Sequence, residues 1–419
     1  MTIFHLNRRQ FLAGSCVAAA WEATVPSFFK QTGVTLAESP SPGDTDQRTL
    51  VLIQLAGGND GLNTLVPFRN DDYYRSRPTL AIAPNQVHRL RDDLGLHPQM
   101  DAMKRLWDDG LVSVVRGVGY PNPDLSHFRS TEIWETGSAS EAMWASGWIG
   151  RYFDNHCQGI ASPMLGLQLG ERTAQTFAGD RPRCVTFSNP DLFRFSGDRQ
   201  RRRDLAALHW QDAMASVATL PVGTSPLDFL QRTGNDLLTM SQQLTDAVTS
   251  TKNTADYLPF QFSQSLKLVA KLIAAEVPTR VFYVSLGGFD HHANQGNSHS
   301  LLLQELSEGL ASFVTDLRGL GCLDRTMVMT FSEFGRRVAE NRNLGTDHGT
   351  ASLMFMAGGN LKPGFHGQQP DLGSLTPNGD LVHHVDFRSI YATVLADWLG
   401  GNPSAILGQA VTPFDGLMT

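Results

Sequence analysis

Four short apolar runs in this chain each stop at glycine or at polar side chains. They are residues 49–56 (TLVLIQLA, before GGNDG), 280–286 (RVFYVSL, before GGFDHH), 326–331 (TMVMTF, before SEFGRR) and 352–357 (SLMFMA, before GGN). Continuous apolar runs of this length, rich in β-branched residues, are typical of strands that are buried on both faces of a parallel sheet. The pattern therefore predicts four buried strands.

Helical periodicity fills the stretches between these runs. Residues 98–109 open with Pro98, a residue favoured in the first turn of a helix. Residues 301–319 repeat leucine and phenylalanine at helical spacing, and Asp386 is a predicted N-cap for a helix over about 387–399. Strands that alternate with helices predict an α/β fold with a doubly wound, mostly parallel sheet flanked by helices.

Composition narrows the class of protein. The chain of 419 residues is 41% hydrophobic and 18% charged, as in an ordinary globular protein, and its net charge is −7. No cluster of Lys and Arg indicates nucleic-acid binding. No apolar run reaches the roughly 18 residues that a membrane span requires. We therefore expect neither nucleic acid nor a membrane-spanning segment.

The N-terminal segment resembles a twin-arginine export leader. Arg8 and Arg9 are followed by Phe11, Leu12 and a weakly apolar stretch. An ordinary basic N-terminus is the alternative. The leader implies a partner, the twin-arginine export machinery, and a periplasmic or extracellular location. We assign residues 1–45 to leader and linker, and residues 46–419 to one α/β domain with a predicted helical insertion near 170–260.

Candidate metal ligands lie just beyond three of the predicted strands, and doubly wound sheets bind their ligands at that edge. Carboxylates and neutral imidazoles are suitable ligands for zinc. The predicted metal site consists of Asp60, Asp290, His292, Glu333, Asp347 and His348. Several separate segments deliver these groups to one edge, so their coincidence indicates a site more strongly than any single residue does.

The first three ligands also have simpler explanations. Asp60 lies in an Asn-Asp-Gly turn, and such a turn alone accounts for an aspartate. Asp290 and His292 are two residues apart, so they share one side of an extended chain while His291 points away. A solvated loop with two histidines is the alternative.

The remaining ligands have alternatives of their own. Glu333 follows a strand and could bind a metal or pair with Arg336. Asp347 precedes His348, and we favour a role in which it orients the imidazole without binding the metal directly.

Ser126 is the candidate nucleophile. A serine hydroxyl attacks an ester only when a metal or a base activates it. The alternative is a simple N-cap for a helix over 127–136, and the two roles are compatible because the helix dipole favours negative charge at that end. His127, like His299, His366, His383 and His384, shows no partner by spacing and is predicted to be structural.

Several motifs together resemble a bacterial family of unassigned function that carries twin-arginine leaders. The motifs are LVLIQLAGGNDGLNTLVP, SHFRSTEIWETG, GGFDHHANQ, TFSEFGRR with GTDHG, and DFRSIYATVLADWLG. That family belongs to the alkaline-phosphatase/sulfatase superfamily. The resemblance covers nearly the whole chain after the leader and implies an alkaline-phosphatase-like fold with metals at the strand ends.

The resemblance also assigns roles within two-metal phosphatases. Asp60 and Ser126 match the aspartate and the nucleophile that share one metal, and Asp290, His292 and His348 match the ligands of the other. Glu333 and Phe334 stand where an Asp-His pair is expected, so the second metal lacks one ligand. The cysteine or serine signature of sulfatases is absent around Ser126.

The sequence therefore predicts an exported, metal-dependent hydrolase of phosphate esters or related sulfate or phosphonate-type esters. Ser126 is the predicted nucleophile, and Asn59 and Arg336 are predicted to contact the substrate, a small-molecule or glycan anionic ester. One or two divalent ions are expected, zinc first, with magnesium, manganese or calcium as alternatives. The competing hypothesis is a catalytically silent exported scaffold or binding protein. A nucleotide-dependent oxidoreductase is disfavoured because no GxGxxG follows the first strand.

Overall fold

A mixed, nine-stranded sheet forms the centre of the computed structural model, which describes residues 48–158, 162, 164–187, 240 and 243–419. Eight strands follow one another in the order β13 (Gly364–Gly367), β5 (Val112–Gly119), β12 (Ser352–Gly358), β9 (Thr326–Phe331), β1 (Thr49–Ala56), β8 (Val281–Gly287), β6 (Gly166–Leu169) and β7 (Cys184–Phe187). The ninth strand, β14 (Val385–Asp386), pairs with β5. The predicted α/β sheet flanked by helices is confirmed.

Strand β12 is the one member of this sheet that runs against its neighbours. It pairs antiparallel with both β5 and β9, whereas β1 pairs parallel with β8 and β9. The expectation of a parallel strand at 352–357 was therefore wrong. A hairpin of β10 (Arg336–Glu340) and β11 (Thr346–His348) joins β9 to β12 in place of a crossover helix. Consequently β12 begins at the edge where β1, β8 and β9 end.

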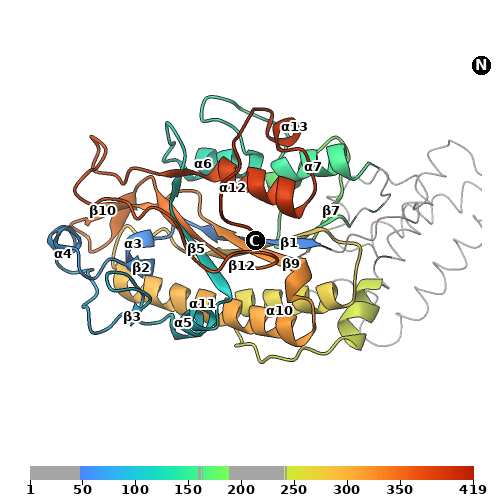
Figure 1. Cartoon of the computed structure of the whole chain (residues 1–419), viewed down its shortest axis with the longest axis horizontal. Helices are drawn as coiled ribbons and strands as arrows, with labels where there is room; N and C mark the ends of the chain where they lie inside the picture. The colour runs from blue at the N-terminus through green and yellow to red at the C-terminus, as the bar shows by residue number, and fades with distance from the viewer. Residues whose placement is uncertain (1–47, 159–161, 163, 188–239, 241–242) are drawn as a thin grey trace, which may run out of the picture.

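Helices cover both faces of the sheet (Figure 1). One face carries α6 (His127–Thr136), α7 (Trp148–His156), α12 (Phe387–Thr393) and α13 (Pro403–Leu407), and the other carries α5 (Asp101–Asp108), α10 (Gln261–Ala274) and α11 (Gln295–Gly319). Side chains of β1 alternate between these layers. Val51, Ile53 and Leu55 join the core beneath α5, α10 and α11, while Leu50 and Leu52 join the other core.

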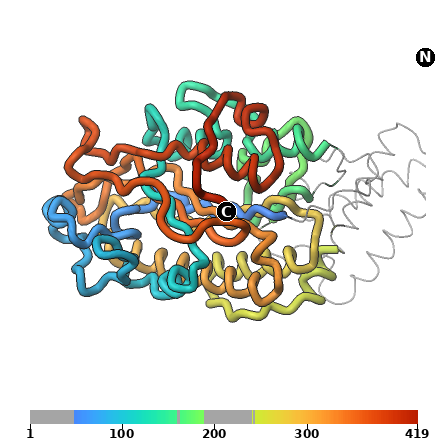
Figure 2. Tube along the Cα trace, viewed as in Figure 1, coloured from blue at the N-terminus to red at the C-terminus, as the bar shows by residue number. Residues whose placement is uncertain are grey.

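Shorter elements complete the described part of the chain. They are α3 (Gly61–Thr64), α4 (Asp71–Ser76), a small sheet of β2 (Leu65–Val66), β3 (His88–Arg89) and β4 (Gly95–Leu96), two 3₁₀ turns (Gln175–Phe177 and Leu323–Arg325) and a π-helix (Val394–Trp398). The π-helix continues α12, and its Trp398 donates a hydrogen bond to the carbonyl of Thr49 over 3.0 Å. The first strand and the last long helix therefore meet (Figure 2).

Most predicted boundaries hold, and the exceptions have local causes. Helix α5 begins at Asp101 and not at Pro98, because Met100 and Gln99 close a turn onto His97. Within the predicted insertion, 170–260, strand β7 belongs to the central sheet, and residues 188–239 lie outside the described part. No described helix is both long and apolar enough to cross a bilayer.

Candidate metal centre

Loops from three strands meet the start of α6 at one edge of the sheet. Gly57, directly after β1, has φ +115°, and a Cβ there would lie 2.5 Å from the backbone nitrogen of Asp290. Only glycine tolerates both that dihedral and that approach. The Gly57 N–H also donates to Oε1 of Glu333 over 2.8 Å. The loops after β1, β8 and β9 are therefore in direct contact.

Asp290, His292 and His348 come together at this edge, as the sequence predicts. Oδ1 of Asp290 lies 3.0 Å from Nε2 of His292 and 3.2 Å from Nε2 of His348. The two imidazole Nε2 atoms are 3.0 Å apart. His348 reaches the edge because it precedes the antiparallel strand β12, whereas Asp290 and His292 follow β8.

A third imidazole, that of His127, completes what we call the His/Asp cluster (His127, Asp290, His292 and His348). Its Nε2 lies 3.3 Å from Oδ2 of Asp290, is buried and has no hydrogen-bond partner. Its Nδ1 lies 2.9 Å from Oε1 of Glu333. The ligand atoms of His127, Asp290 and His348 all lie within 4.8 Å of one another. His127, which the sequence predicted to be structural, is therefore a further candidate ligand.

Oxygen acceptors fix the tautomers of the other two imidazoles. Nδ1 of His348 lies 2.7 Å from the carbonyl oxygen of Leu125, which can only accept a hydrogen bond. Nδ1 of His292 lies 3.1 Å from Oδ1 of Asp347. In His348, whose pKa burial lowers, the Nδ1–H is thus engaged and Nε2 presents a lone pair toward Asp290.

Three members of the His/Asp cluster, His127, Asp290 and His348, form a group that could hold a metal ion. Its closest ligand atoms are 3.0–3.3 Å apart. Two ligands bonded to zinc at about 2.0 Å in a tetrahedral arrangement are separated by about 3.3 Å. The second ring nitrogen of each histidine, Nδ1, faces an oxygen acceptor, which is the usual arrangement around metal-bound imidazoles.

The local electrostatics favour the ligand forms of these side chains. Partial burial alone would raise the pKa of Asp290, but the hydrogen bond and the charge of Arg336 hold it well below its usual range. Burial lowers the pKa of His348. At neutral pH, Asp290 is therefore ionised and His348 is neutral, as metal binding requires.

Asp60 is not part of the His/Asp cluster. Its carboxylate is 2% exposed and accepts hydrogen bonds from Gln295 and from the backbone N–H groups of Leu62 and Asn63. Oδ2 also pairs with Nη1 of Arg77 over 2.6 Å. Burial opposes ionisation, but the Arg77 charge and the hydrogen bonds hold the pKa of Asp60 at about 2. The predicted ligand is instead the N-cap of α3 and half of a buried ion pair.

The two predicted substrate-binding residues are also buried. Asn59 is 1% exposed, and its side-chain oxygen accepts hydrogen bonds from Thr64 and His299. Neither Asn59 nor Arg336 offers a surface that a substrate can reach.

Arg336 is a structural clamp. Its guanidinium donates to the carbonyls of Gly57, Gly58 and Thr346 and to Oδ1 of Asp290, the last over 2.6 Å. With its side chain 1% exposed, it joins three loops and positions Asp290. The sequence assigned Arg336 to substrate binding, whereas in the structure its guanidinium is occupied by these acceptors.

Glu333 and Asp347 support the imidazoles. Oε1 of Glu333 accepts the Nδ1–H of His127, while its Oε2 is buried and has no hydrogen-bond partner. Asp347 accepts the Nδ1–H of His292, in keeping with the orienting role that we favoured. The ring of Phe334 packs against His127 and His348, with centroids 4.9 and 4.4 Å away.

Ser126 lies at the margin of the His/Asp cluster. It precedes His127 and is the N-cap of α6, but its side chain makes no capping hydrogen bond. The residue is exposed. Both of its neighbours touch the cluster, since the Leu125 carbonyl bonds His348 and His127 faces Asp290.

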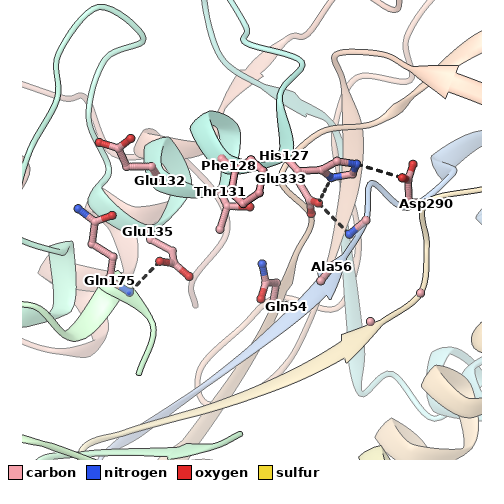
Figure 3. Close-up of a pocket in the computed structure, with 13 residues that line it drawn as sticks. Gln54, Ala56, His127, Phe128, Thr131, Glu132, Glu135, Gln175, Asp290 and Glu333 are labelled. Carbon is pink, nitrogen blue, oxygen red and sulfur yellow. Dashed lines mark hydrogen bonds and ion pairs between the residues drawn. The ribbon is translucent and has the colours of Figure 1, made fainter. Parts of the chain in front are cut away.

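A cavity of about 600 Å³ opens beside the cluster, between α6 and the ends of β1 and β8 (Figure 3). It is lined by Gln54, Ala56, Gly57, His127, Phe128, Thr131, Glu132, Glu135, Gln175, Gly287, Gly288, Asp290 and Glu333. His127, Asp290 and Glu333 form one end of it. A metal at the cluster would therefore be accessible from a space that can hold a small molecule.

A profile of the family described as a protein of unknown function, DUF1501, matches residues 47–398. The chain belongs to the DUF1501 family. The match extends from β1 to the end of the π-helix, so it includes every member of the His/Asp cluster. No curated protein matches this DUF1501 chain significantly.

Several solved structures are similar to the DUF1501 chain at 10% identity. A lipoteichoic acid synthase from Listeria monocytogenes aligns over 82% of this chain and 73% of its own, with a TM-score of 0.34. A protein of the alkaline phosphatase superfamily from Vibrio parahaemolyticus aligns over 87% of this chain and 72% of its own, with a TM-score of 0.33. A C-terminal periplasmic domain from Escherichia coli aligns over 78% of this chain and 77% of its own, with a TM-score of 0.33. Similarity at this level is too low to transfer an activity.

Proposed function

We propose that this DUF1501 chain is an exported, metal-dependent hydrolase of phosphate or related esters. The observation that carries the proposal is the convergence of three imidazole Nε2 atoms on Asp290 at the end of an open cavity. Each of these imidazoles is held by an oxygen acceptor at Nδ1. A divalent ion bound there would neutralise charge that develops on the transferred group and favour deprotonation of the nucleophile.

Ser126 is the proposed nucleophile. Its hydroxyl is exposed beside two residues that touch the cluster, and the amino end of α6 favours a negative oxygen there. Its Oγ would bond to the phosphorus or sulfur atom while the ester bond to the alcohol breaks and the alcohol takes up a proton. Water would then cleave the serine ester and restore the hydroxyl.

A specific observation favours a second candidate, a metal-binding protein without turnover. Asp60 is committed to Arg77, and Phe334 occupies the place of a second-site histidine. Among the described residues, one cluster has metal-ligand geometry. A single ion with no second metal suits either a mononuclear hydrolase or a binding site.

The test is bound metal in the exported protein, measured by elemental analysis beside a His292→Ala, His348→Ala double variant. About one equivalent in the native protein, lost in the double variant but retained in His366→Ala, supports a metal centre. His366 is a suitable control because its ring bonds only a carbonyl, that of Lys362. No metal under chelator-free conditions overturns the metal centre.

Turnover separates the two candidates. If the protein is a hydrolase, the native protein should cleave phosphate or sulfate monoesters. Ser126→Ala should reduce this turnover at least a hundredfold while metal content is unchanged. A protein that retains metal but cleaves no ester is the binding protein.

A further inference from the structure

The cavity beside the His/Asp cluster is a slot with one helical wall. His127, Thr131 and Glu135 recur every four residues on α6 and line it, with Phe128 and Glu132 beside them. Eight residues of helix rise about 12 Å, so Glu135 marks the end far from the cluster. Figure 3 shows this succession of side chains along the cavity. A substrate that reaches both ends must be longer than its ester group.

Two glycines, Gly287 and Gly288, line the slot without side chains. Gly287 is the last residue of β8, and a Cβ added there would meet no atom within 4 Å. Gly288 follows it, with only the Leu302 side chain near the position of a Cβ. Side chains at these two positions would project into space that is now free.

The floor of the slot holds a hydrogen-bond donor in a fixed orientation. Oε1 of Gln54 accepts from the hydroxyl of Tyr283 over 3.0 Å and from that of Ser285 over 3.3 Å. The amide is thereby oriented, and its Nε2 donors are directed away from those hydroxyls toward the slot (Figure 3). Thr131 adds a hydroxyl that both donates and accepts.

Charge in the slot argues against a second anionic group. Among the described residues, four carboxylates line it, and neither lysine nor arginine does. The carboxylates of the far half are not free for a cationic group either. Glu132 pairs with Arg129 over 2.8 Å. Oε2 of Glu135 accepts from the Gln175 N–H over 2.8 Å, its Oε1 lies 3.2 Å from the Tyr283 hydroxyl oxygen, and burial raises its pKa to about 7.

An aromatic ring stands at the rim. The side chain of Phe128 is 92% exposed and lines the slot. An aromatic ring in a slot that also holds amide and hydroxyl groups is suited to a ligand with one apolar face and many hydroxyls.

From this geometry we infer that the slot binds an uncharged, hydroxyl-rich part of the substrate, that is, a sugar unit. Gln54 and Thr131 hydrogen-bond its hydroxyls and Phe128 packs on its face. The inference rests on the proposed function, because the ester of that sugar would face the His/Asp cluster. The specificity of the enzyme then lies in α6 and the end of β8.

Binding of free sugars tests the slot without requiring turnover. Ligand-observed NMR with the native protein would use glucose, galactose, N-acetylglucosamine and maltose as probes. We expect at least one of these neutral sugars to bind at millimolar concentration. Glucuronate and glucosamine, charged analogues of the same size, should bind at least tenfold more weakly.

Variants of residues that line the slot test whether the sugars bind there. Gly287→Val fills the free space, and Gln54→Leu removes the amide donor; each should weaken the best sugar at least tenfold. Gly296→Val is the matched control, since a Cβ at Gly296 also meets no atom within 4 Å and this residue does not line the slot. Its sugar binding should equal that of the native protein.

The outcomes separate this inference from the proposed function. Sugar binding that survives in the His292→Ala, His348→Ala variant but not in Gly287→Val supports the slot, whatever the ester assays show. Absence of binding by all four neutral sugars overturns it. So does binding that Gly287→Val leaves intact, or tighter binding of either charged analogue. Loss of metal in the double variant, measured on the same samples, reports on the metal centre alone.

Discussion

Nδ1 of His127 lies 2.9 Å from Oε1 of Glu333, a carboxylate that is almost fully buried. This contact joins the first residue of α6 to the loop after β9. Carboxylates in that position orient metal-bound imidazoles and raise their basicity. The contact therefore gives Glu333 a role that does not require it to bind the metal itself.

Glu333→Gln keeps a hydrogen-bond acceptor for His127 but removes the charge. We expect metal affinity to fall by about 10- to 100-fold, the usual effect of losing such a partner. Competition with a fluorescent chelator would measure it. Glu171→Gln, at an exposed position, is the control. Unchanged affinity in Glu333→Gln would contradict the supporting role.

Asp60→Asn should destabilise the fold and leave the metal content unchanged. Removing one partner of a buried ion pair costs about 3–5 kcal/mol, because Arg77 then keeps an uncompensated charge. Urea unfolding at pH 7 would measure this. Asp72→Asn, which breaks the exposed pair with Arg75, should leave the unfolding midpoint unchanged. Loss of metal in Asp60→Asn would instead support the interpretation of Asp60 as a metal ligand.

The same ion pair predicts an acid dependence. The pKa of Asp60 is about 2 in the folded protein, below its ordinary value of 3.8. Its stabilisation is therefore fully present above pH 3.8 and is lost as the pH falls through about 2. Unfolding midpoints between pH 5 and pH 2 should fall more steeply in the native protein than in Asp60→Asn. Parallel curves would contradict the assignment.

Glu135 predicts a dependence of the opposite sign. Burial raises its pKa from 4.5 to about 7, so the folded state holds a proton that the unfolded state releases. Stability should therefore fall as the pH rises from 4.5 to 7, by on the order of 3 kcal/mol at about 1.4 kcal/mol per pKa unit. Glu135→Gln, measured by urea unfolding at pH 5 and pH 7.5, should flatten this slope. An unchanged slope would be the contradicting result.

Arg336→Lys should destabilise the protein by about 1–3 kcal/mol, even though it preserves the charge. Lysine offers a point charge and cannot reach carbonyls of three loops at once, as the planar guanidinium does. Thermal unfolding would measure the loss. Arg337→Lys is the neighbouring control, because Arg337 is 40% exposed at its side chain. Equal melting temperatures for the two variants would argue against the clamp.

Sequence alone predicted the parts of the structure that depend on local pattern. Apolar runs located β1 and β9 to the residue. The spacing of Asp290 and His292 after a strand placed both at the metal edge. His348 was also placed just before the strand at 352–357, and because β12 runs antiparallel this histidine lies at the same edge.

The contacts that the sequence did not indicate share a physical cause, which is that they depend on distant partners. Asp60 follows β1 as a ligand would, but α3 turns it toward Arg77, 17 residues later in the chain. His127 carries no spacing signal, because its partners Asp290 and Glu333 lie far along the sequence. The one available signal was its place as the first helical residue after the proposed nucleophile.

The clamp made by Arg336 also bears on which metal the proposed site would bind. A guanidinium and backbone groups hold the loops after β1 and β8 and the strand β11, so these interactions position the proposed ligands in the same way for any ion. Affinities of such a site follow the general order of divalent ions and do not select one by shape. The resident ion would then be decided by what the compartment of folding supplies, and the same chain from two growth media could carry two different metals.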